Sequence, residues 1–340
     1  MSHIAYSRTG YFFHTDFLQA VMDTPPCLYF PRFKTKKIGS SIAYFIQPRK
    51  VRFEWQDTPI DWIPDQPFAS YFVNEINNIL PAGEFWFCRL YNKVLPQITD
   101  EKLRADVQAF IRQEAMHAQA HNSANKKYLT ERQIDIQRNL EIMNFLFNKL
   151  LADQPLGLKI PNIAAHQWDL FRLGIIATVE HMTCVLGKYA LYNTEWERLG
   201  ADPNMLDLVK WHGAEEIEHH SVAFDLYRHL GGSYLARYYL SIVVIIGVIG
   251  LWVDGAAHLL SQDPRFKQYK PAVYKPWIWK EWWRISQQDN RLLPNPLWLV
   301  SQQLGYMMPW YDPVHEANTE DALHYLQHSA AAKRAGLKVA

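Results

Sequence analysis

Two copies of a Glu-x-x-His motif constrain the fold of this chain more than any other feature of its sequence. One copy runs from Glu114 to His117 and the other from Glu216 to His219, each within a long segment of helical periodicity. Residues three positions apart on a helix lie on one face, one turn from each other. Each motif therefore presents a carboxylate and an imidazole that can bind the same metal ion.

A single glutamate precedes each motif by enough residues for a helical hairpin. Glu84 comes before Glu114, and Glu180 comes before Glu216. This order, Glu, Glu-x-x-His, Glu, Glu-x-x-His, is the ligand pattern of ferritin-like di-iron carboxylate proteins. The sequence thus predicts an all-α fold: a ferritin-like four-helix bundle with extra helices and an irregular N-terminal segment. The four ligand-bearing segments fall at about 68–95, 100–129, 162–199 and 203–230.

The last of these segments offers more ligand candidates than its motif needs. At about 100° per residue, His212 falls on the same face as Glu216 and His219. We predict that it is a seventh ligand, which would make the two ions unequal; the alternative is a histidine that only hydrogen-bonds to a ligand. Glu215 lies on the flank of this face and is the alternate to Glu216.

Other polar residues near the pattern are expected to support the ligands by hydrogen bonds or to replace one of them. His121 lies one turn after the first motif histidine, His181 points away from the ligand face, and Asp225 follows the second motif. Cys88 and Cys184 each lie one turn after a ligand glutamate. They either border the cavity as oxidisable thiols or, as we favour, fill the core as small side chains.

The chain divides into four parts by composition. Residues 1–66, rich in proline and aromatic residues, are predicted to form an irregular N-terminal arm. Residues 67–232 form the di-metal bundle, in which Pro81 is expected to kink the first helix. Residues 233–262 form an apolar helix. Residues 263–340 form a Trp- and Pro-rich extension that packs on the bundle.

Charge and cysteine content restrict the partners and the compartment. The chain carries 35 basic and 34 acidic residues and no long basic run, so nucleic acid is not an expected partner. Three cysteines without a Cys-x-x-Cys pair argue against a disulfide framework and favour a reducing compartment. No signal peptide is recognised at the N-terminus, so we expect a cytoplasmic protein.

One uncharged run, residues 238–253, qualifies that expectation. As a helix it would be about 24 Å long, short of a bilayer hydrocarbon core of about 30 Å. The expected role is a buried core helix, or one that covers an oligomer surface or a lipid-facing surface. Membrane-surface association through 238–253 and formation of a homodimer are therefore left open.

Three motifs carry a family resemblance. The sequences at 81–84, 110–118 and 211–225 resemble those of the bacterial family called "predicted metal-dependent hydrolase", over residues 50–260. The resemblance implies a hydrolase. The ligand order alone, with its extra histidine four residues before the last ligand glutamate, is similar to that of the di-iron arylamine N-oxygenases.

The donor set leaves three functions to weigh. Four carboxylates with two or three imidazoles suit two ions of iron, with manganese or zinc as alternatives. We expect a non-haem di-iron oxidase or oxygenase that activates dioxygen on a hydrophobic or aromatic small molecule, with an electron donor. The alternative is a di-metal hydrolase using a bridging hydroxide. The third interpretation is a non-enzymatic, metal-binding, membrane-associated protein.

Overall fold

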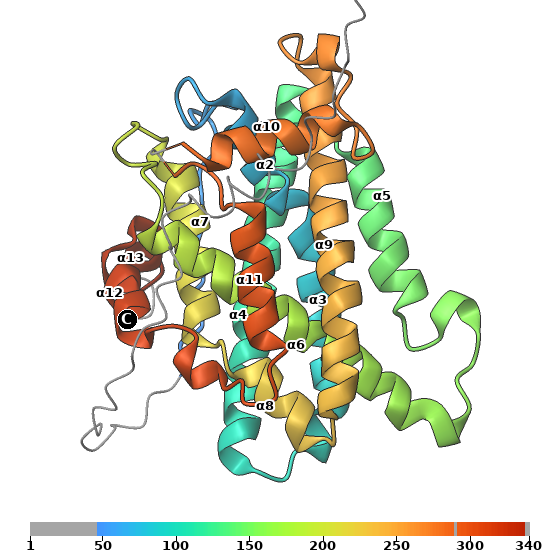
Figure 1. Ribbon diagram of the computed structural model, residues 1–340. Helices are drawn as coiled ribbons and strands as arrows, with labels where there is room; N and C mark the ends of the chain where they lie inside the picture. Colours follow the sequence, from blue (N-terminus) through green and yellow to red (C-terminus); the bar gives the residue numbers. More distant parts are fainter. Residues whose placement is uncertain (1–45, 289–290, 337–340) are drawn as a thin grey trace, which may run out of the picture. The chain divides into compact units, whose positions relative to one another are not determined.

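The computed structural model of the chain describes residues 46–288 and 291–336. Every regular element in these ranges is a helix and none is a strand, which confirms the predicted all-α class. Residues 46–66 contain no helix, and the rest of the predicted N-terminal arm lies outside the described residues. Figure 1 shows the helices coloured in the order of the chain.

Two helix pairs carry the residues of the predicted metal site. Within each pair the helices pack along each other, and the pairs contact each other through α3 with α6 and through α4 with α7. The pairs are α3 (Ile76–Val94) with α4 (Glu101–Ser123), and α6 (Asn162–Tyr192) with α7 (Pro203–Glu218).

Capping residues fix where the two motif-bearing helices begin. Asp100 precedes α4 and accepts a hydrogen bond from the Leu103 N–H at 2.8 Å. Asp202 precedes α7 and accepts one from the Met205 N–H at 2.9 Å. Pro203, which has no N–H to satisfy, occupies the first position of α7. Both starts thus follow from the preference of an N-cap for a short acidic side chain and of the first turn for proline.

Two predicted helical segments are interrupted. Glu75 separates α2 (Pro67–Asn74) from α3, whereas α3 continues through Pro81, where we expected a kink. The segment predicted at 203–230 forms two helices, because α7 ends at Glu218 and α8 (Val222–His229) follows it. The second motif histidine therefore lies just beyond α7.

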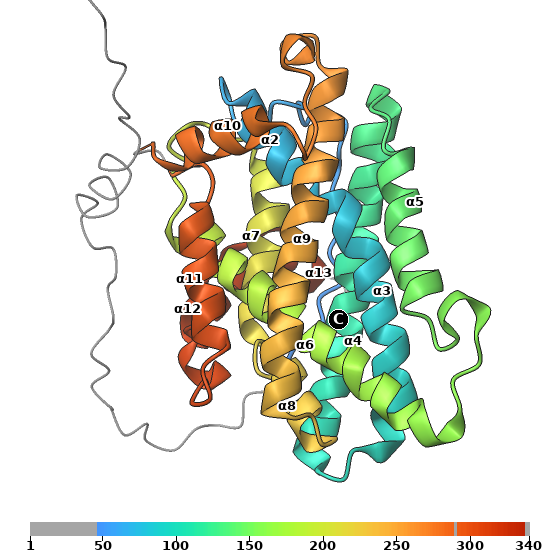
Figure 2. The ribbon, with the colours of Figure 1, turned by 45° about the vertical axis from the view of Figure 1, so that its right-hand side comes forward.

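Helix α9 (Tyr234–Gln262) covers the ligand-bearing helices on one side. It contacts α6, α2 and α3, and in both Figure 1 and Figure 2 it runs beside α3. Its aromatic Trp252 packs on Phe72 of α2, with ring centroids 5.1 Å apart. Phe72 also packs on Trp282 of α10 (Pro276–Ser286), at 4.9 Å, so one aromatic cluster joins three helices.

The remaining helices pack around this arrangement. Helix α5 contacts α3, α11 contacts α6, and α12 and α13 both contact α7. The C-terminal helices therefore cover the second helix pair. Their bounds are Gln137–Phe145 for α5, Pro296–Tyr306 for α11, Thr319–His328 for α12 and Ala330–Gly336 for α13.

Helices α6 and α9 are long and apolar enough to cross a membrane by length and composition alone. The apolar window of α6 has a mean hydropathy of 1.4 and is 67% buried, as in a core helix. The window of α9 has a mean hydropathy of 2.2 and is 44% buried, and it exposes Tyr239, Val243 and Ile246. Helix α6 is therefore mostly covered by the rest of the protein, whereas α9 keeps an apolar outer face.

Helices α6 and α7 touch through glycines. A Cβ atom on Gly187 would lie 2.4 Å from the carbonyl oxygen of Gly213, closer than van der Waals contact allows. The backbones can approach only because neither residue has a side chain. This approach brings the second pair of ligand-bearing segments together.

We therefore expect Gly187→Ala to lower the free energy of unfolding by about 1–3 kcal/mol, because the added methyl forces the helices apart. Gly247→Ala is the matched control, since a Cβ atom there has no atom within 4 Å. It should stabilise α9 by about 0.5–1 kcal/mol through helix propensity. Denaturant unfolding of both variants checks this, and equal effects would contradict the close approach.

Glu75 is a buried carboxyl at the α2–α3 junction. Its Oε2 accepts hydrogen bonds from the side-chain amides of Asn78 at 2.8 Å and Asn139 at 2.9 Å. Its Oε1 fills the space that a side chain on Gly255 would occupy. Burial raises the pKa of Glu75 to about 8, against the two amide hydrogen bonds, which lower it. The protonated form is thus the one that the fold prefers.

Because the pKa of Glu75 is raised on folding, its contribution to stability is fully present below its unfolded pKa and is lost as pH rises towards 8. The loss is about 1.4 kcal/mol per pH unit between the two pKa values. We expect Glu75→Gln to melt like the wild type at pH 5 and at a clearly higher temperature at pH 8. Glu131→Gln, which replaces an exposed carboxylate by the same amide, is the matched control. Calorimetry at both pH values measures the difference.

Candidate metal centre

The structure brings the seven predicted ligands together in the protein interior. All of them are buried, with at most 6% of any one residue exposed. His219 lies in the break between α7 and α8, yet its ring still points inward, since its Nε2 is 3.2 Å from an oxygen of Glu180. The seven are Glu84 on α3, Glu114 and His117 on α4, Glu180 on α6, His212 and Glu216 on α7, and His219 directly after α7.

Their ligand atoms form overlapping groups, in each of which all atoms lie within 4.8 Å of one another. Glu114 belongs to two of these groups, so it lies where a carboxylate could bridge two ions. One group is Glu84, Glu114 and His117, and another is Glu114, Glu180, Glu216 and His219.

His212 lies on the Glu84 side of the cluster. Its Nε2 is 2.7 Å from Oε1 of Glu216 and 3.8 Å from Oε1 of Glu84. The centroids of the His212 and His117 rings are 4.2 Å apart. The extra imidazole would therefore join the ion nearest Glu84 and His117.

Many polar atoms of the cluster have no hydrogen-bond partner. A buried acceptor without a donor is costly, and a buried carboxylate without a cation more so. The unpaired atoms belong to residues of the candidate metal-binding groups, so a metal cation fits this donor set. They are both oxygens of Glu84, both oxygens of Glu114, Oε2 of Glu180, Nδ1 of His117 and Nε2 of His219.

The His219 ring is oriented from outside the cluster by Gln113. The side-chain amide nitrogen of Gln113 donates to Glu218 at 2.7 Å, so its Oε1 must accept from Nδ1–H of His219 at 2.9 Å. In the neutral ring, the Nε2 of His219 then carries a lone pair. It faces oxygens of Glu180 at 3.2 Å and Glu114 at 3.4 Å, which are acceptors as well.

The His117 ring is oriented by Glu215 on the side away from the cluster. Its Nε2 lies 3.0 Å from Oε2 of Glu215, which leaves Nδ1 to face Glu114 at 3.3 Å. Glu215 also accepts a hydrogen bond from Trp211 and forms an ion pair with Arg49. Glu215, the alternate ligand, thus contacts a ligand histidine from outside.

Protons can partly replace a cation within this cluster. Burial disfavours the charged rings, but Glu114 and Glu216 raise the pKa values of His117 and His219, respectively, well above their usual range. Burial and neighbouring carboxylates raise the pKa values of Glu84 and Glu180. Metal binding must therefore displace protons.

Of the other predicted site residues, His121 lies at the edge of the cluster. It forms a further candidate group with Glu84 and His212, and its Nε2 is 2.6 Å from Nδ1 of His212. His181 is buried against the C-terminal extension, where its Nδ1 is 3.1 Å from the Tyr311 hydroxyl. Asp225 is exposed on α8. None of these positions tests whether the seven central residues bind metal, so that assignment stays a prediction.

The two cysteines lie beside the helix core. Cys184 is buried, and the thiol of Cys88 donates to the carbonyl of Ile111 at 3.3 Å. Burial raises the pKa of Cys88 to about 12 and that of Cys184 well above its usual value. Neither lines the two cavities next to the cluster, which fits the interpretation as small core side chains.

These two cavities adjoin the cluster and share several lining residues. The larger is about 110 Å³ and the smaller about 60 Å³, and both are walled almost entirely by apolar side chains. Their shared walls include Leu80, Val179 and Val248, with Glu216 of the cluster and Thr183 beside it. A small apolar molecule held there would lie against the predicted ligands.

Sequence reasoning missed the residues that hold the ligands from outside. Gln113 and Arg49 are polar residues that a sequence alone would place in solvent. Thr183, whose hydroxyl donates to Glu216, resembles any other helix residue. The one available signal was position, since Gln113 directly precedes the first motif.

Residues 47–317 match the sequence profile of a family described as "Predicted metal-dependent hydrolase". The chain belongs to this family. The match to the metal-dependent hydrolase family confirms the resemblance seen in the three motifs, and it spans every residue of the cluster. No curated protein and no solved structure matches the chain.

Family membership supports a metal-dependent enzyme. Of the reactions that the sequence predicted, it favours hydrolysis over the expected oxidation by dioxygen. The similarity to the arylamine N-oxygenases, the ferritin-like classification, the number of ions and their identity stay predictions.

We expect Glu114→Ala to lose most of the bound metal, because Glu114 belongs to two of the ligand groups. The wild type loaded with metal should melt at a higher temperature than its metal-free form, and the variant should not. Metal analysis by mass spectrometry and thermal melting measure both effects. Asp225→Ala, which removes an exposed carboxylate, is the control, and unchanged metal content in Glu114→Ala would refute the assignment.

Proposed function

We propose that this protein is a hydrolase with two divalent ions in a ferritin-like four-helix bundle, acting on a small apolar molecule. Glu114 and Glu216, which each belong to two candidate groups, would help to hold both ions. The family description and the apolar cavities beside the cluster support this proposal. The first ion would be bound by Glu84, His117 and His212, and the second by Glu180 and His219.

The unpaired acceptors at the centre are the observation that carries the proposal. Glu84 and Glu114 each bury two oxygens without a donor, and two ring nitrogens face these and the neighbouring carboxylates. Repulsion among four buried carboxylates would oppose folding unless positive charge lies between them. Two divalent ions would neutralise the four carboxylates.

The chain's own groups would prepare the site for hydrolysis. When bound, the two ions would polarise the scissile group and make a water molecule more acidic. Thr183 donates to Oε2 of Glu216 and so holds this carboxylate in place. The apolar walls restrict water, and in a site of low dielectric the charge interactions of the centre are strong.

The size of the cavities limits the substrate. Together they would hold a short alkyl or aromatic group, and their lining offers few polar atoms besides the cluster itself. We therefore propose an apolar ester, amide or phosphate ester whose scissile bond faces Glu216. No nucleic acid is proposed as a partner.

A second candidate function is oxidation of an apolar molecule by dioxygen at a di-iron centre. The observation that favours it is the donor set, which consists of four carboxylates and three imidazoles without a thiolate, beside an apolar cavity. This function would also require an external electron donor. Oxidation by dioxygen needs a redox-active metal such as iron, whereas hydrolysis does not.

The outer face of α9 supports a further proposal on localisation. Its exposed apolar side chains would contact a membrane surface or a second copy of the chain. A cytoplasmic protein that binds membranes reversibly is the form we propose. A homodimer through the same face is the alternative.

The test uses the full chain, freed of metal and reloaded with zinc, manganese or iron. We expect the zinc or manganese form to cleave short-chain nitrophenyl esters or phosphate esters without dioxygen, and Glu180→Ala to lose at least 100-fold in kcat/KM, about 2.7 kcal/mol. If no metal form hydrolyses any ester or amide, while the iron form consumes dioxygen with a reductant, the second function replaces the first.

A further inference from the structure

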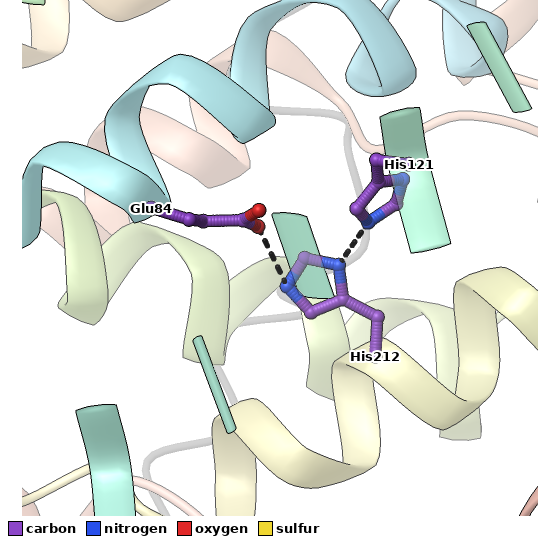
Figure 3. Close-up of side chains that lie close together, drawn as sticks. All are labelled: Glu84, His121 and His212. Atoms are coloured by element: carbon purple, nitrogen blue, oxygen red, sulfur yellow. Dashed lines mark hydrogen bonds and ion pairs between the residues drawn. The ribbon is translucent and has the colours of Figure 1, made fainter. Parts of the chain in front are cut away.

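A line of hydrogen bonds leads from the start of α3 to the metal cluster. Oδ1 of Asn77 lies 2.9 Å from Nδ1 of His121, and Nε2 of His121 lies 2.6 Å from Nδ1 of His212. The other ring nitrogen of His212 faces Glu84. Figure 3 shows His212 between His121 and Glu84. All four residues are buried.

The orientation of the Asn77 side-chain amide determines which group donates in each of these hydrogen bonds. The side-chain nitrogen of Asn77 donates to the backbone carbonyl of Asn74 at 3.2 Å. An amide flip would place two oxygens against each other, so Oδ1 of Asn77 is the atom that faces His121. An amide oxygen only accepts, and Nδ1 of His121 must therefore carry a hydrogen.

The hydrogen on Nδ1 of His121 in turn determines which nitrogen of His212 carries a hydrogen. A neutral imidazole with a hydrogen on Nδ1 has a lone pair on Nε2. Nε2 of His121 then accepts from Nδ1–H of His212 across 2.6 Å. His212 is left with a lone pair on Nε2, which faces Oε1 of Glu216 at 2.7 Å and Oε1 of Glu84 at 3.8 Å. The 2.7 Å separation is a hydrogen-bond distance, so either a proton or a metal ion would lie between Nε2 of His212 and the carboxylate of Glu216.

We propose that Asn77 and His121 are positioning residues that fix His212 in its Nδ1–H tautomer, so that its Nε2 binds the metal ion next to Glu84. The inference rests on the proposed metal centre. It assigns His121 to the support of a ligand rather than to the metal, because its Nε2 lone pair is already used by His212.

This support differs from that of the other two ligand rings. His117 hydrogen-bonds to the carboxylate of Glu215 and His219 to the amide of Gln113, whereas His212 donates to a neutral imidazole. A carboxylate partner increases the basicity of a ligand imidazole more than a neutral one does. The two ions would therefore be bound with unequal affinity, as the extra histidine predicted.

The first test measures the binding of cobalt(II) to the metal-free full chain by its absorption spectrum. His121→Phe keeps a ring of similar size but removes the acceptor. We expect it to weaken one of two binding steps by about 10–100-fold, the usual effect of losing such a partner, and to leave the other within threefold. His121→Gln supplies a side-chain oxygen as acceptor and should restore most of the lost affinity.

Asn78→Ala is the matched control. Asn78 is buried beside Asn77, but it hydrogen-bonds to Glu75 instead of His121. It should bind cobalt like the wild type. Wild-type binding by His121→Phe, or an equal loss at both steps in His121→Phe and Asn78→Ala, would overturn the proposal. Melting curves show whether each variant is folded.

The second test reads the tautomer directly from imidazole nitrogen-15 chemical shifts. We expect His121 to carry its hydrogen on Nδ1, both in the metal-free protein and with zinc. A hydrogen on Nε2 of His121 would overturn the proposal. If the wild type binds no metal or hydrolyses nothing, the proposed function fails, while the tautomer of His121 still decides whether this line of hydrogen bonds exists.

Discussion

Four glutamates buried within one small volume are the constraint on which the rest of this structure depends. Their mutual repulsion in an apolar interior would oppose helix packing, so either protonation or positive charge must accompany them. Carboxylates of the cluster raise the pKa values of His117 and His219, so protonation of these rings would supply part of that charge when no metal is bound. Metal ions would supply it more completely. The pairing of α3 with α4 and of α6 with α7, and the glycine contact that lets α6 and α7 approach, hold these carboxylates within reach of one another.

Each ligand imidazole is held by a different partner on the side away from the centre. Glu215, which forms an ion pair with Arg49, hydrogen-bonds to His117. Gln113 hydrogen-bonds to His219. His212 hydrogen-bonds to His121, which in turn contacts Asn77. These partners decide which nitrogen faces inward, and therefore whether a ring offers a lone pair or a hydrogen to the centre. The ligand set alone does not contain that information. A site with the same seven residues but other partners would bind metal with a different affinity on each side.

A small apolar molecule bound in the cavities beside the cluster would lie next to the predicted metal ligands. The shared walls of these cavities come from α3, α6, α7 and α9, so the helix that carries the uncharged run 238–253 also borders them. A hydrolase and a dioxygen-using oxidase would both benefit from such a space, because each must restrict water around a reactive centre. The sequence favoured the oxidase from the donor set, whereas membership of the metal-dependent hydrolase family favours hydrolysis. The distinction depends on the metal that the cluster binds.

The sequence by itself determined the helical class and the residues that meet at the centre. Two Glu-x-x-His motifs and two single glutamates at hairpin spacing carry that information locally, because three-residue spacing fixes a helix face. The sequence could not show that the break after Glu218 leaves His219 outside a helix, or that the first segment divides at Glu75. It also could not show the roles of Arg49, Asn77 and Gln113. Those roles arise from contacts between residues far apart in the chain, and only tertiary packing decides which buried polar side chains meet.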